Sequence, residues 1–180
     1  QYADIPVING LTDLLHPCQV LADLQTIREH KGKLAGLKLA FIGDGNNMAH
    51  SLMNGGARMG MHVAVACPDG YQPDAAVLAQ AQAAAKESGG SVAVLADPMA
   101  AAAGADVIYT DVWASMGQEA EKAEREKIFG GVYQVNDELM AAANPGAMVL
   151  HCLPAHRGEE ITEAVFEAHP EIFDEAENRL

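Results

Sequence analysis

The stretch AMVLHCLPAHRG, from Ala147 to Gly158, joins a short apolar run to a cluster of reactive side chains. Residues 148–150 have the composition of a β-strand, and the run stops at a thiol, two imidazoles and a guanidinium. Pro154 interrupts regular structure because it lacks a backbone N–H and has a fixed φ. The reactive groups are therefore expected just beyond the C-terminal end of a strand, where open α/β sheets bind ligands.

Strand-like and helix-like segments alternate outward from this stretch. The predicted strands are 37–42, 62–66, 92–95, 106–110 and 148–150. The predicted helices are 17–31, 48–59, 74–87, 98–103, 118–128, 137–143 and 163–168, with the start of another at 177–180. The helix at 118–128 is polar and is expected to be largely solvated. The alternation predicts an α/β fold, a doubly wound, Rossmann-like parallel sheet of about five strands with helices on both faces.

Three polar loops follow predicted strands, at 43–47, 111–117 and 151–157. The carboxyl ends of parallel strands lie at one edge of the sheet. Residues far apart in the sequence are therefore expected to meet there and form one pocket.

Charge and cysteine content exclude several classes of protein. The net charge is −14 at pH 7, which argues against nucleic acid or an anionic membrane as a partner. The three cysteines are far apart and form no Cys-x-x-Cys pair, so a disulfide framework or zinc ribbon is not expected. Reduced thiols and the absence of a long apolar run favour a cytoplasmic protein.

The loop GDGNN at 43–47 allows three interpretations. It follows a strand and opens a helix, as a dinucleotide-binding loop does, but Met48 stands where the third glycine of that motif belongs. It also suits a tight turn with a helix cap. The amides of Asn46 and Asn47 suit a third role, binding of a carboxylate at a helix N-terminus.

Asp111, His16 and Gln19 also have two interpretations each. An aspartate at a strand end binds an ammonium group or caps a helix. His16 and Gln19 are three residues apart, so both can project from one face of the first helical turn. They either bind a small polar ligand or serve as a cap and a solvated side chain.

Cys152 has two imidazoles near it in sequence, His151 and His156. A lone cysteine is most often a small buried apolar residue. Nucleophilic catalysis requires a lowered thiol pKa, which a sequence does not reveal. The spacing matches no recognised metal motif, and no metal site is predicted.

Four segments together resemble the signatures of the aspartate/ornithine carbamoyltransferase family. They are HPCQ at 16–19, GDGNN at 43–47, DVWASMG at 111–117 and HCLPAHRG at 151–158, and EAENR at 175–179 matches as well. The Ser-Met-Gly part of the third segment points to the ornithine branch of the family. The implied reaction transfers a carbamoyl group from carbamoyl phosphate to the δ-amine of L-ornithine, giving citrulline and phosphate, without a cofactor.

The resemblance also implies roles for individual residues. The ornithine-binding positions are Asn47, Asp111, Ser115 and Met116. The carbamoyl-phosphate-binding positions are His16, Gln19, Cys152, Leu153 and Arg179. Catalytic roles fall to Cys152, Asp111 and His16, with Cys152 orienting groups or handling a proton and not attacking as a nucleophile.

The family also has an N-terminal domain with a Ser-x-Arg-Thr phosphate loop, and that motif is missing here. Residues 1–32 are therefore interpreted as a linker segment and interdomain helix, and 33–180 as the ornithine-binding domain of a longer protein. The carbamoyl-phosphate domain and the final helix are expected to be absent. The full-length enzyme is expected to be a homotrimer, and this piece alone to be inactive or nearly so. The alternatives are a carbamoyltransferase for another amine such as putrescine, or a non-catalytic Rossmann-like ligand-binding module.

Overall fold

The computed structural model describes residues 4–114 and 119–179. Its centre is a parallel sheet in the order β3-β2-β1-β4-β5. The strands are β1 (Lys38–Ile42), β2 (His62–Ala66), β3 (Ser91–Leu95), β4 (Val107–Thr110) and β5 (Met148–His151). This confirms the predicted doubly wound, Rossmann-like sheet of five strands. The chain moves from β1 outward to β3 and then crosses back to β4, so the topological switch point lies between β1 and β4.

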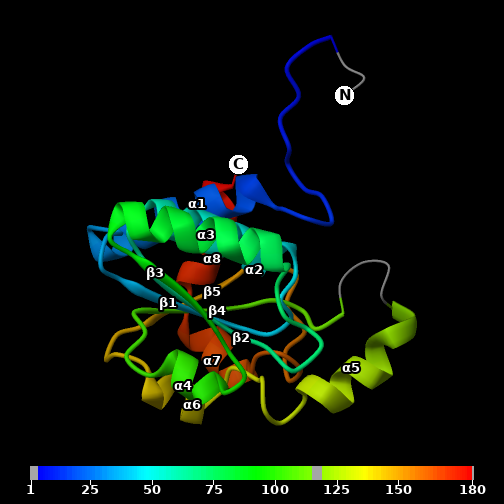
Figure 1. Cartoon of the computed structure of the whole chain (residues 1–180). Coiled ribbons are helices and arrows are strands. Elements are labelled where there is room, and N and C mark those ends of the chain that lie inside the picture. The colour runs from blue at the N-terminus through cyan, green and yellow to red at the C-terminus, as the bar shows by residue number, and fades with distance from the viewer. Residues whose placement is uncertain (1–3, 115–118, 180) are drawn as a thin grey trace.

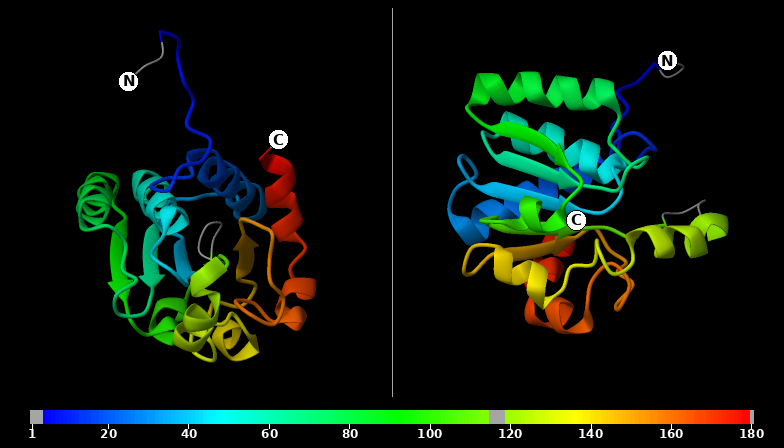
Figure 2. Two further views of the ribbon diagram at one scale, coloured as in Figure 1. Left: turned by 90° about the vertical axis from the view of Figure 1, so that its right-hand side faces the viewer. Right: turned by 60° about the horizontal axis from the view of Figure 1, so that its bottom comes forward.

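Helices cover both faces of the sheet (Figure 1). One layer contains α1 (Pro17–Lys31), α2 (Asn47–Arg58) and α3 (Ala75–Ser88). The opposite layer contains α4 (Pro98–Ala102), α6 (Asp137–Ala142) and α7 (Glu163–Ala168), while η1 (Glu119–Glu121) and α5 (Lys122–Phe129) project to one side. The last helix, α8 (Glu171–Asn178), packs on β5 and α1, as the left view of Figure 2 shows.

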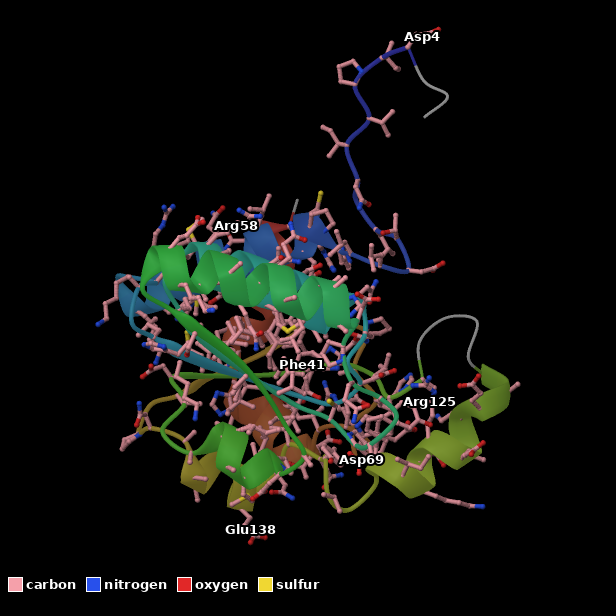
Figure 3. All side chains as sticks on the ribbon, in the orientation of Figure 1. Asp4, Phe41, Arg58, Asp69, Arg125 and Glu138 are labelled. Carbon is pink, nitrogen blue, oxygen red and sulfur yellow. The ribbon has the colours of Figure 1, made fainter. Side chains whose placement is uncertain are left out.

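Strands β1, β2, β4 and β5 are buried on both faces because each layer has its own apolar core, whereas the edge strand β3 is only partly buried. Phe41 and Tyr109 face the α1–α3 layer, and Ile42 and Ile108 face the other. Neighbouring residues of a strand point to opposite faces, so a sheet covered twice needs continuous apolar runs. Figure 3 shows Phe41 between the layers. This double burial is why the strand positions could be predicted from apolar runs alone.

The helix starts follow the usual capping chemistry of proteins. Pro17 is the first residue of α1, where its missing N–H leaves no backbone bond unmade. The side chains of Asp97, Asn136 and Thr162 each accept a hydrogen bond from a backbone N–H in the first turn of α4, α6 and α7.

The helix prediction at the C-terminal end is wrong. The chain does not start a helix at 177–180, because α8 already spans Glu171–Asn178 and ends there. Its apolar face is short, and buried Glu175 interrupts the pattern that would have indicated a helix. The polar helix predicted at 118–128 is largely solvated as expected, and Arg125, which is 6% exposed, is the exception among residues 120–128.

An N-terminal arm, residues 4–16, leads into α1 and stands away from the sheet (Figures 1 and 3). It carries exposed apolar side chains, among them Ile5, Val7 and Ile8. Among the helices described, none combines the length and the hydropathy that a membrane crossing requires.

Candidate active site at the carboxyl edge of the sheet

Three loops meet beside the switch point, as the alternation of strands and helices predicts. Asp111 follows β4, Cys152 follows β5, and Asn46 precedes α2. The Cys152 thiol donates to Asp111 Oδ1 at 3.0 Å, and Asn46 Nδ2 donates to Asp111 Oδ2 at 2.9 Å. Asp111 is 7% exposed and Cys152 is 8% exposed. The buried Asp111 carboxylate thus links all three loops. No helix begins within the described residues 111–114, so Asp111 does not cap a helix there.

The environment of Cys152 keeps its thiol protonated. Burial raises the pKa of Cys152 well above its usual value, and the negative charge of Asp111 raises it further. The thiol also donates its proton to that carboxylate. A nucleophilic cysteine needs the opposite shift, so the geometry favours an orienting or proton-handling role.

The GDGNN loop has the structure of a tight turn with a cap. Asn46 caps α2, because its Oδ1 accepts from the backbone N–H groups of Met48 and Ala49. A Cβ at Gly45 would lie 2.4 Å from the backbone nitrogen of Pro73, so glycine is required for close backbone packing. Met48 is buried in the core beneath. These packing roles account for both features that suggested a dinucleotide.

Asn47 lies on the first turn of α2, next to Asn46, and is half-buried. Its Nδ2 donates to the backbone carbonyl of Thr12 at 2.9 Å, which fastens the N-terminal arm to α2. Its side chain is therefore near the site but engaged by the arm. Ser115 and Met116 lie outside the described residues.

His16 and Gln19 lie at the start of α1 on the same side of the site. His16 occupies the N-cap position of α1 without a side-chain cap, and its backbone N–H donates to Ser51 Oγ at 2.7 Å. Its buried Nδ1 has no hydrogen-bond partner among the described residues. Burial lowers the pKa of His16, which favours the neutral imidazole.

Gln19 is fully buried in a polar network that the sequence did not reveal. Its Nε2 contacts Asp23 Oδ1 and Glu175 Oε1, and its Oε1 accepts from Arg179. Tyr109 adds a hydroxyl that donates to Asp23 at 3.1 Å. The only sequence signal was an acid four residues after Gln19 on the buried face of a helix.

Arg179 connects this network to the reactive loop, residues 151–157 at the end of β5. Its Nη1 lies 2.6 Å from Gln19 Oε1 and 3.0 Å from the backbone oxygen of Cys152, and donates to both. Leu153, the next residue, is half-buried and has a φ of 53°. The structure therefore brings Gln19, Cys152, Leu153 and Arg179 together, although α1 and α8 are separated by most of the chain.

Asp111, His151 and Cys152 also bring three potential metal ligands within 4.8 Å of one another. Their hydrogen bonds argue against a metal. Both ring nitrogens of His151 are engaged, by Glu160 and by a backbone N–H, and the thiol is bonded to the carboxylate. The atoms that could bind a metal are therefore already engaged in hydrogen bonds.

Two family models match the chain. The Asp/Orn binding domain of aspartate/ornithine carbamoyltransferases matches residues 35–180. The carbamoyl-P binding domain of the same enzymes matches residues 1–29.

Curated and solved relatives agree with these matches. An ornithine carbamoyltransferase of Symbiobacterium thermophilum is 61% identical over 100% of this chain and 58% of the relative. One from Thermococcus kodakarensis is 58% identical over 100% of this chain and 57% of its own length. The structure of ornithine carbamoyltransferase from Pyrococcus furiosus superposes with a TM-score of 0.94 and 57% identity, covering 99% of this chain and 57% of that one. The chain thus spans less than three fifths of these relatives.

Proposed function

The chain belongs to the aspartate/ornithine carbamoyltransferase family, and we propose that it is the ornithine-binding part of an ornithine carbamoyltransferase. The proposed reaction moves the carbamoyl group of carbamoyl phosphate to the δ-amine of L-ornithine and releases citrulline and phosphate. The observation that carries the proposal is the contact of the Cys152 thiol with Asp111 at the switch point of the sheet. This contact brings together two of the segments that carry the family resemblance, 111–117 and 151–158.

Ornithine offers a carboxylate, an α-ammonium group and a terminal amine. We propose that the Asp111 carboxylate receives the α-ammonium group and that the Asn47 amide receives the carboxylate. Ser115 and Met116 complete this subsite. Asn47 must exchange its bond to the Thr12 carbonyl for one to the ligand, which fits its place on a half-buried first helical turn.

The chemical step requires a neutral amine, because an ammonium group has no lone pair. Asp111 is an acceptor for the proton that the δ-amine loses, and the protonated Cys152 thiol beside it orients the carboxylate. The amine attacks the carbamoyl carbon, and the carbonyl oxygen becomes an oxyanion. Arg179 and His16 are donors suited to stabilise that oxyanion before phosphate leaves. Gln19 and Leu153 line the same subsite.

The remainder of the active site lies, in this proposal, on the part of the carbamoyl-phosphate domain that is outside the chain, since the model of that domain matches only residues 1–29 here. Residues 1–32 would then be the linker and interdomain helix, and 33–180 the ornithine-binding domain. The assembled enzyme is proposed to be a homotrimer. The three cysteines of this chain form no disulfide within the described residues. Free thiols favour the reducing cytoplasm.

The first test is turnover by the full-length enzyme and by the 180-residue chain. The full-length enzyme should form citrulline from L-ornithine and carbamoyl phosphate, and the isolated chain should have little or no activity. No citrulline from the full-length enzyme would refute the function. Turnover by the isolated chain near that of the full-length enzyme would refute the division of the active site.

A second test compares two amines in the Asn47→Ala variant. KM for L-ornithine should rise about ten-fold, because a hydrogen bond to a charged group is lost. Putrescine has no carboxylate, so its KM should stay unchanged. Calorimetric titration with NAD serves as the control for the nucleotide interpretation, and NAD binding would overturn the assignment.

A further inference from the structure

A second buried acid lies behind the reactive loop. Glu160 and His151 are both fully buried, and His151 Nε2 lies 3.0 Å from Glu160 Oε1. The other ring nitrogen, Nδ1, accepts from the backbone N–H of Leu153 at 2.8 Å. Because Nδ1 is an acceptor, the proton of the neutral ring is on Nε2 and points at Glu160. The hydrogen bonds therefore select one tautomer of His151.

Glu160 holds the far end of the same loop. Its Oε1 also accepts from the backbone N–H of His156 at 2.6 Å. One carboxylate oxygen thus fixes the side chain at the start of the loop and the backbone at its end. Cys152 and Leu153 lie between these two points.

The loop needs this support because its backbone is strained. Leu153 has a φ of 53°, a left-handed conformation that a non-glycine residue rarely adopts. Its N–H is held by His151, and His151 is held by Glu160. Removal of Glu160 would leave the buried imidazole N–H of His151 and the partly buried backbone N–H of His156 unpaired, and would free the loop to relax.

We propose that Glu160 is a positioning residue for carbamoyl transfer, which acts through His151 and the His156 N–H to hold Cys152 and Leu153 in their reactive geometry. This inference rests on the proposed function, because Cys152 and Leu153 are assigned there to the carbamoyl group. Glu160 itself touches no substrate. Its loss is expected to affect carbamoyl phosphate more than ornithine, since Asn47 and the Ser-Met-Gly loop belong to other segments.

Glu171, the first residue of α8, is a control with the same types of partner as Glu160. Glu171 Oε1 contacts one histidine ring, His169 Nδ1 at 2.8 Å, and accepts from one backbone N–H, that of Val149 at 3.0 Å. Glu160 has the same pair of partner types. Glu171, however, supports the middle of β5 and contacts no residue of the reactive loop. Replacing each with alanine therefore removes the same kind of interaction at two places.

The experiment uses the full-length enzyme with Glu160→Ala, Glu160→Gln and Glu171→Ala. Glu160→Ala should lower kcat/KM for carbamoyl phosphate about ten- to hundred-fold, the cost of misplacing reacting groups by about 1 Å. KM for ornithine should change less than about two-fold by the same argument. Glu160→Gln keeps an acceptor oxygen and should recover activity to within about three-fold of wild type. Glu171→Ala should lose less thermal stability than Glu160→Ala, because the Glu171 side chain is 12% exposed and that of Glu160 is fully buried, and it should keep its kinetic constants.

Equal kinetic constants for Glu160→Ala and Glu171→Ala would overturn the proposal. Equal loss of kcat/KM in Glu160→Gln and Glu160→Ala would also overturn it, because the acceptor oxygen would then be irrelevant. The ¹⁵N spectrum of His151 gives a measurement that does not depend on turnover. It should show the Nε2–H tautomer in wild type, and the Nε2 resonance should shift in Glu160→Ala because the acceptor of its proton is gone. A wild-type Nδ1–H tautomer would refute the clamp. Absence of turnover by wild type would count against the proposed function alone.

Discussion

Arg125 and Arg157 make nearly the same contacts in two different environments. Arg125 pairs with Asp44 at 2.6 Å and with Glu121 at 3.0 Å, and lies 5.0 Å from the centre of the Tyr71 ring. Arg157 pairs with Glu163 at 2.9 Å and with Glu167, and lies 4.4 Å from the centre of the Phe166 ring. Each guanidinium thus has two carboxylates and one aromatic face.

Their burial differs. The Arg125 side chain is 8% exposed and its partner Asp44 is 14% exposed, whereas the Arg157 side chain is 39% exposed and both of its partners face solvent. A surface ion pair is screened by water and contributes little, while breaking a buried pair leaves a charge without solvation. The same contacts therefore have a different energetic weight in the two clusters, because water is excluded from one and not from the other.

The buried arginine also braces the candidate active site. Arg125 Nη1 donates to the backbone oxygen of Trp113 at 2.9 Å, in the loop that follows β4. Its partner Asp44 belongs to the loop that follows β1. Figure 3 shows Arg125 at the side of the molecule where α5 projects. One guanidinium therefore ties α5 to two of the three loops of the site.

The largest effect is expected from Arg125→Gln. It leaves Asp44 buried without a cation, so unfolding should become easier by about 3 kcal/mol. Guanidinium unfolding at pH 7 measures this, with Arg157→Gln as the matched exposed control. Equal losses in the two variants would show that burial is not what separates the clusters.

Arg125→Lys sharpens the same comparison. Lysine keeps the charge but not the planar fork that reaches Asp44, Glu121 and the Trp113 carbonyl together. The expected loss of unfolding free energy is about half of that for Arg125→Gln, near 1.5 kcal/mol. A loss as large as that of Arg125→Gln would mean that geometry and not charge holds the cluster.

The cluster around Gln19 gives a pH test, since its two carboxyls accept from no lysine or arginine within the described residues. Burial raises the pKa of Asp23 well above its usual value, and the Glu175 charge raises it further. As pH rises above about 4, Asp23 loses its proton in the unfolded chain before it does so in the folded one. The folded state then holds more protons than the unfolded state. Stability should therefore fall from about pH 4 towards the folded-state pKa.

Asp23→Asn should flatten that dependence, because an amide keeps the acceptor for Gln19 and Tyr109 without titrating. Its unfolding free energy at pH 7 should lie within about 1 kcal/mol of wild type. Unfolding curves from pH 5 to pH 8 for both proteins measure the slope. An unchanged slope would assign the pH dependence to other groups.

The smallest effect is expected from Arg157→Gln. The melting temperature should change by less than about 2 °C in low salt, because exposed ion pairs contribute little. In about 1 M salt the difference should vanish, since the Debye length is then about 3 Å. A larger shift that persists in salt would mean that packing over Phe166 stabilises this loop.

Local rules explain how much of this molecule was predictable. The strands at 62–66 and 148–150 could be predicted because strands covered on both faces must be apolar throughout. The caps at Asp97, Asn136 and Thr162 follow from residue type and position alone. The burial of Arg125 could not be predicted, because its partner Asp44 is 81 residues away and nothing in a polar helix indicates that one cation is enclosed.

The sequence by itself determined the order of strands and helices, the loops that meet at one edge of the sheet, and the family to which the motifs point. These depend on patterns that span a few residues. Only the tertiary structure decided that Cys152 keeps its proton against Asp111, that Gln19 is enclosed by Asp23, Glu175 and Arg179, and that Glu160 clamps the reactive loop. The physical reason is that protonation and hydrogen-bond partnership depend on burial and on neighbours, which folding brings together from distant parts of the chain.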